Sequence, residues 1–155
     1  MNWAAVEALG TWATAIVAGG GLLFVRLQLK QVERTIRGDV HERLTTESIE
    51  ILKFLATNPE SYSYFYEGKL LTKDDPNRVF VLYAAEITAN YMEHVINQKG
   101  NMSEQDRKVW DHFVVDTCKL APIVRTFLLE RKEWYSPELI GIVEDVQKRA
   151  ASTHP

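Results

Sequence analysis

A run of 18 residues without a charged side chain, Ala8–Val25, constrains this 155-residue chain more than any other feature. A helix rises about 1.5 Å per residue, so the run would form a helix of roughly 27 Å, close to the ~30 Å hydrocarbon core of a bilayer. Four basic residues follow it, namely Arg26, Lys30, Arg34 and Arg37. Because basic residues concentrate on the cytoplasmic side of membrane spans, we expect one span with the N-terminus outside.

Two other interpretations of this run, a signal peptide and a buried helix, fit the residues less well than a span. A cleaved signal peptide would carry basic residues before its apolar run, but only Glu7 is charged there. A buried helix of a soluble protein would contain Gly19, Gly20 and Gly21, each costing roughly 1 kcal/mol relative to alanine. Transmembrane helices tolerate glycine because it allows close contact between backbones. A span is therefore favoured, with Trp3 at its outer interface and the four basic residues at its inner one.

Small residues form two rows within the predicted span. Thr11, Ala15 and Gly19 follow one another at steps of four, and so do Gly10, Thr14 and Ala18. Such rows let a second helix approach closely in a membrane. They predict self-association through this segment, so the expected partners are the lipid bilayer and further copies of the chain.

The composition is that of a folded protein, with 46% hydrophobic and 25% charged residues. A net charge of −3 makes nucleic acid an unfavoured partner. The lone Cys118 has no cysteine for an internal disulfide, which fits a reducing compartment. Glycine-rich phosphate loops, zinc signatures and nucleophilic triads are absent from the sequence, so we predict no cofactor and no metal.

The rest of the sequence predicts helices only. Apolar residues recur at steps of three and four from Leu27 to Leu55, which indicates that the first helix continues until Asn58-Pro59. Further helices are expected over 77–98, from Glu104 and from Pro137, and Pro122 should bend or restart the third. The predicted fold is all-α, a transmembrane helix continuing into a cytoplasmic bundle of about four helices. Its parts would be 1–29 for the span and interface, 30–151 for the bundle and 152–155 for a polar tail.

The helix expected over 77–98 carries two predictions. Its buried face is assigned to six residues by their spacing: Val79, Leu82, Tyr83, Ile87, Tyr91 and Val95. Glu86, Asn90 and His94 lie at steps of four, with Glu93 beside them. A di-iron bundle would need a Glu-x-x-His motif on each of two helices, and this pattern is missing. A buried polar network that joins helices is the favoured role.

Arg107 and His112 form the one pattern that suggests catalysis. An Arg-x4-His pair on a helix resembles the ribonuclease motif of HEPN domains, helical bundles in which the two residues act on the 2′-hydroxyl and the scissile phosphate. Arg34 with His41, and Arg149 with His154, satisfy the same loose spacing. The pattern is thus expected by chance, and a membrane-tethered ribonuclease remains an alternative function.

Several segments together resemble a known group of proteins. They are "RLQLKQ" after the apolar helix, then "NPESYSYFYEGK", "DDPNRV", "AAEITANYMEHV" and "EWYSPEL". Nearly the whole chain is similar to a widespread bacterial family of small membrane-anchored proteins with a domain of unknown function, which implies the bacterial inner membrane. The architecture also resembles the small membrane accessory protein of RNA-targeting CRISPR loci, which assembles into a ring-shaped pore.

These observations lead to one expected function with two alternatives. The chain would be a non-enzymatic, self-associating membrane protein that acts as an oligomeric assembly, either a pore or a scaffold for a cytoplasmic protein partner. The alternatives are the ribonuclease that uses Arg107 and His112 and an accessory subunit of a larger membrane complex.

Overall fold

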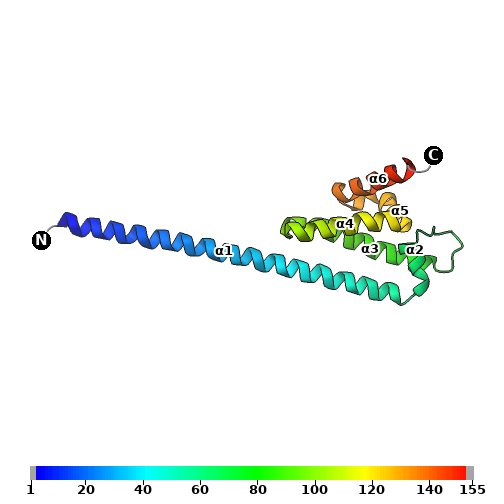
Figure 1. Cartoon of the computed structure of the whole chain (residues 1–155), viewed down its shortest axis with the longest axis horizontal. Coiled ribbons are helices and arrows are strands. Elements are labelled where there is room, and N and C mark those ends of the chain that lie inside the picture. Colours follow the sequence, from blue (N-terminus) through cyan, green and yellow to red (C-terminus); the bar gives the residue numbers. More distant parts are fainter. Residues whose placement is uncertain (1–2, 153–155) are drawn as a thin grey trace. The chain divides into compact units, whose positions relative to one another are not determined.

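The computed structural model describes residues 3–152, with side chains from Gly19 onward. Within this part of the chain every regular element is a helix, as the sequence predicts (Figure 1). The chain divides into two compact units, Met1–Asp39 and Val40–Pro155. The boundary predicted at residue 29 marks the end of the expected membrane span and its interface. The boundary after Asp39 separates two compact units, which is a different property.

The first helix, α1 (Trp3–Ala56), is 54 residues long and confirms the predicted continuous helix. A Cβ added at Gly21 or Gly38 would meet no atom within 4 Å, so neither position needs glycine for space. The helix ends before Asn58, which has extended backbone angles of φ −130° and ψ 90°. The following Pro59 enforces this, since its ring excludes the helical conformation for the residue before it.

No helix in the part of the chain that the structure describes is long and apolar enough to cross a membrane. The side chains of residues 1–18 lie outside that part. The predictions made for Trp3, Gly10, Thr11, Thr14, Ala15 and Ala18 therefore stay predictions.

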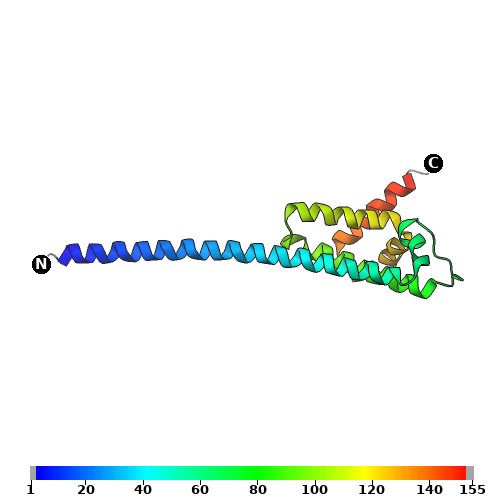
Figure 2. The same ribbon diagram turned by 60° about the horizontal axis from the view of Figure 1, so that its bottom comes forward.

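The second unit is a helical bundle (Figures 1 and 2). Residues 40–56 of α1 are followed by a short helix and four longer ones: α2 (Tyr62–Tyr66), α3 (Arg78–Gln98), α4 (Glu104–Leu120), α5 (Pro122–Glu130) and α6 (Pro137–Ser152). The described bundle thus has more helices than the four or so predicted. The additional helices are α2 and α5, and α5 begins at Pro122, which restarts the helix as one of the two predicted outcomes.

The helix starts follow the predicted capping residues. The Ser103 hydroxyl oxygen accepts a hydrogen bond from the Asp106 amide at 3.1 Å, which satisfies a free N–H in the first turn of α4. Ser136 does the same for the Leu139 amide at 3.3 Å, with Pro137 at the first position of α6. Local side-chain chemistry therefore sets both helix starts.

The predicted buried face of α3 is wrong for three of its six residues, while Leu82 is partly buried against the core. Val79 and Tyr83 are 68% and 62% exposed, and Ile87 is also exposed. The buried face is instead rich in small residues, including Ala84, Ala85, Ala89 and Thr88. Small side chains let neighbouring helices approach closely, and α5 packs on this face. Tyr91 and Val95 are the two predicted residues that are buried.

Residues 40–56 of α1 are held to the bundle by two buried apolar side chains, Leu44 and Leu55, and by several polar contacts. The Leu44 side chain is fully buried, and its carbonyl oxygen accepts a hydrogen bond from the Tyr91 hydroxyl at 2.8 Å. His94 Nδ1 lies 2.7 Å from Glu47 Oε2, and His41 Nδ1 lies 3.1 Å from Asp106 Oδ1. This end of α1 is thus a member of the bundle.

Candidate functional site

The first unit presents an apolar helix surface that nothing in its own described residues covers. Leu22, Leu23, Phe24 and Val25 follow one another, with Leu27 and Leu29 after them, and all six are exposed. By helical periodicity these side chains lie on several sides of the helix, interrupted by Arg26 and Gln28. Beyond Lys30 the apolar positions narrow to one side, at Val32 and Ile36. Apolar side chains therefore lie on several sides of α1 up to Leu29 and on one side beyond it.

One row on this surface has heptad spacing. Leu22, Val25, Leu29, Val32 and Ile36 alternate steps of three and four residues, and every one of them is exposed. Apolar residues at this spacing form the seam of coiled coils, where each side chain inserts between four residues of the facing helix. We call these five residues the seam.

The predicted interface residues Arg26, Lys30, Arg34 and Arg37 are exposed on α1. At 100° per residue, Lys30 and Arg34 lie on the side of the helix opposite Val32. Arg37 forms an ion pair with Glu33 one turn away. The basic side chains thus leave the seam uncovered.

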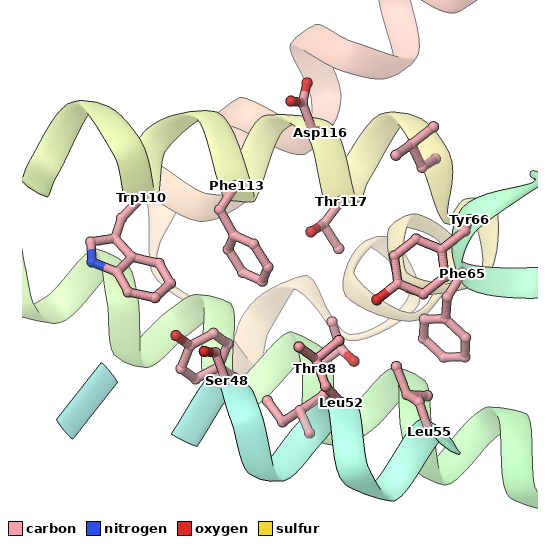
Figure 3. Close-up of a pocket in the computed structure, with 13 residues that line it drawn as sticks. Ser48, Leu52, Leu55, Phe65, Tyr66, Thr88, Trp110, Phe113, Asp116 and Thr117 are labelled. Atoms are coloured by element: carbon pink, nitrogen blue, oxygen red, sulfur yellow. The ribbon is translucent and has the colours of Figure 1, made fainter. Parts of the chain in front are cut away.

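The second unit contains a cavity of about 390 Å³ between the end of α1, α2, α3 and α4. Figure 3 shows Trp110, Phe113 and Thr117 of α4 facing Ser48, Leu52 and Leu55 of α1, with Phe65 and Tyr66 at one end. A second hollow adjoins it and shares Leu52, Leu55 and Tyr66 with its lining. The two hollows together form an elongated apolar groove along α1.

The cavity wall is uncharged where it faces the interior. Asp116 is the charged residue of the lining, and its carboxylate points away from the cavity (Figure 3) and pairs with Lys119 at 3.0 Å. The polar groups of the wall are hydroxyls, from Ser48, Thr88 and Thr117 among others. A site of this volume, mainly apolar with a few polar groups, has the properties of a small-molecule pocket.

Arg107 and His112 both lie exposed on α4, outside the cavity lining. Five residues of helix separate them by about 140° around the axis, so the two side chains diverge. The structure does not bring them together within one chain. Their neighbour Asp111 instead pairs with Lys99 at 2.6 Å, and Lys99 also contacts Glu138 at 2.7 Å.

The predicted polar network on α3 joins three helices, but it is not buried as predicted, because Asn90 is exposed and Glu93 and His94 are half-buried. His94 Nδ1 contacts Glu47 Oε2 of α1 at 2.7 Å. Glu93 accepts hydrogen bonds from the Ser136 amide at 3.1 Å and the Ser136 hydroxyl at 2.9 Å. The Tyr135 hydroxyl donates to Asn90 Oδ1 at 3.1 Å. These groups fix α1 and the start of α6 to α3. Among the described residues, no three His, Cys, Asp or Glu side chains form a cluster that could bind a metal ion.

The contact between Glu47 and His94 should make the stability of the bundle depend on pH. Burial raises the pKa of Glu47, but hydrogen bonds from Arg43 and His94 outweigh this and lower it below 4.5. A depressed pKa stabilises the fold above the unfolded value and loses that effect as the pH falls through the folded value. We expect the stability difference between the protein and Glu47→Gln, measured by urea unfolding, to be largest above about pH 5 and to shrink below pH 4.5.

Glu50→Gln is the matched control for this measurement, because Glu50 pairs with Lys53 at 2.7 Å within α1 alone. A Glu47→Gln variant whose stability difference from the protein were the same at both ends of this pH range would contradict a role for the pair.

Cys118 should react slowly with thiol reagents. Burial raises the pKa of its thiol to about 11, against a weaker opposite effect of Arg125. Only the thiolate attacks a disulfide reagent, and an accessible cysteine has a pKa near 8.5. We expect Ellman's reagent at about pH 8 to label the folded protein at least 100-fold more slowly than the urea-unfolded protein. Equal labelling rates would show that Cys118 is accessible in the folded bundle.

Sequence reasoning missed the cavity. Its lining combines Ser48, Phe65, Thr88 and Trp110, which come from four helices and are far apart in the chain. The density of aromatic residues over Tyr62–Tyr66 was the one sequence signal that could have pointed to this cavity.

Comparisons with known protein families, with curated proteins and with solved structures found no match.

Proposed function

We propose that this chain is a non-enzymatic, single-span protein of the bacterial inner membrane that self-associates through α1 and holds a helical bundle in the cytoplasm. The observation that carries the proposal is the exposed seam on α1. Burying a Leu, Val or Ile side chain from water contributes about 1.5–3 kcal/mol, so leaving Val32 and Ile36, the seam residues beyond the proposed span, exposed to water is costly without a partner.

A second copy of the same helix is the partner that the seam favours. Identical chains anchored in one membrane point the same way, so the coiled coil would be parallel. In that arrangement the flanking residue Gln28 of one helix would lie beside Glu33 of the other, and Gly21 beside Arg26. These pairs bring no like charges together, so nothing opposes the parallel register.

The seam begins inside the predicted span, at Leu22 and Val25, and its spacing continues towards the N-terminus. Thr11, Ala15 and Ala18 extend the same alternation of three and four residues before Leu22. Small residues suit close packing in lipid, whereas larger ones suit a coiled coil in water. One helix face would thus associate first within the membrane and then beyond it, and the assembly would act as a pore or as a scaffold for a cytoplasmic protein.

The mass of the intact assembly in mild detergent tests this proposal. We expect a multiple of the 17.8 kDa chain mass, stable over a range of protein concentrations. A strict monomer at every concentration would contradict self-association.

Protease treatment of sealed inside-out vesicles tests the orientation and should digest the bundle. Protection of the bundle would contradict the proposed orientation.

A further inference from the structure

We propose that the cavity between α1 and α4 binds an uncharged single-chain amphiphile, an aliphatic chain that ends in a hydroxyl group. This inference concerns the bundle alone and goes beyond the proposed assembly. The cavity volume of about 390 Å³ is within the range of small-molecule sites.

The shape of the site favours a chain over a compact molecule. The cavity continues into a second hollow that is lined by Ala56, Pro59 and Tyr62 in addition to the shared residues. Both hollows follow α1, and apolar side chains border them along this length. The rim residues Leu52, Tyr62 and Leu120 are more than 40% exposed. An aliphatic chain would remove these surfaces from water, which is the main favourable term in such binding.

The charge of the site selects against an ionised head group. The lining of the cavity includes no lysine, arginine or histidine, and its one carboxylate points outward (Figure 3). A carboxylate or ammonium group placed inside would lose its hydration without gaining an opposite charge. A neutral head group avoids this cost.

The hydroxyls of the wall indicate which neutral head group fits. Ser48 donates its hydroxyl proton to the Thr45 carbonyl at 2.8 Å, and Thr88 donates to the Ala84 carbonyl at 2.8 Å. With their protons used in the helices, these oxygens can still accept hydrogen bonds. A ligand hydroxyl can donate to them, so we place the head near Ser48 and Thr88 and the chain towards Tyr62.

Three ten-carbon probes test the inference on the full chain in lipid nanodiscs: 1-decanol, decanoate and decylammonium. Trp110 lines the cavity and reports binding through its fluorescence, once Trp3, Trp12 and Trp134 are replaced by phenylalanine. We expect a saturable change with decanol and at least a tenfold weaker response to each charged probe. The nanodisc lipid absorbs each probe equally for every variant, so variants are compared directly.

Filling the cavity should remove the response. Thr117→Phe fills it from α4 and Ser48→Leu from α1, so one variant remains if the other fails to fold. Val109→Phe, at an exposed position of α4, is the matched control and should respond as the parent does. A decanol response that survives filling, a missing response in the parent, or equal affinity for all three probes would overturn the inference. A monomeric chain that still bound decanol would refute the assembly alone.

Discussion

Replacing two seam residues by aspartate, Val32→Asp together with Ile36→Asp, is expected to convert the assembly into monomers. In a coiled coil both side chains would lie between helices, where an unpaired carboxylate costs several kcal/mol. A loss of about 4 kcal/mol corresponds to an association constant roughly 1,000-fold lower. The mass of the assembly in mild detergent, measured over a range of concentrations, gives this change directly.

The control for this variant carries the same change in charge on another side of the helix. Gln31→Asp with Gly38→Asp also adds two negative charges, but both positions lie away from the seam by helical periodicity. A Cβ at Gly38 meets no neighbour, so the substitution introduces no clash. This control should assemble like the parent protein. If it dissociates to the same extent as the seam variant, charge and not seam packing governs association.

Truncation of Leu44 is expected to have the largest effect on bundle stability. Its side chain has 0% exposure and packs in the core where α1 meets the bundle. Leu→Ala at such a site removes buried methylene groups and leaves a cavity, at a cost of about 2–5 kcal/mol. We expect the urea midpoint of Leu44→Ala to fall accordingly, monitored by far-UV circular dichroism of the full chain.

Ile49→Ala is the matched control for Leu44→Ala, since Ile49 is on the same helix and 45% exposed. Exposed substitutions usually change stability by less than about 0.5 kcal/mol. Equal losses for the two variants would show that residues 40–56 of α1 do not depend on the anchor at Leu44.

Helix boundaries were predictable where the signal is local. Pro59 and Pro122 interrupt helices because the proline ring excludes the helical conformation before it, and Ser103 and Ser136 cap helices through their own hydroxyls. These effects need only a few neighbouring residues. The buried face of α3 was not predictable in this way, because apolar side chains lie around much of its circumference. Contact with α5 buried the alanines and left Val79 and Tyr83 exposed.

The seam on α1 and the cavity of the bundle also differ in whether a local sequence pattern can predict them. The seam is a periodic pattern within one helix, so its spacing is readable from the chain, and the structure adds that its side chains are exposed. The cavity depends on how four helices are placed, and no local pattern connects Ser48 with Thr88 or Trp110.

The sequence by itself determined that the chain is helical, where most helices begin and end, and that one long helix carries a continuous apolar row. Hydrogen bonding, proline geometry and side-chain periodicity act over a few residues, so they are encoded locally. Only the tertiary structure decided which face of α3 is buried, that Arg107 and His112 diverge, and that an uncharged cavity lies beside α1. Those outcomes depend on packing between residues far apart in the chain, where the fit of whole surfaces outweighs any local preference.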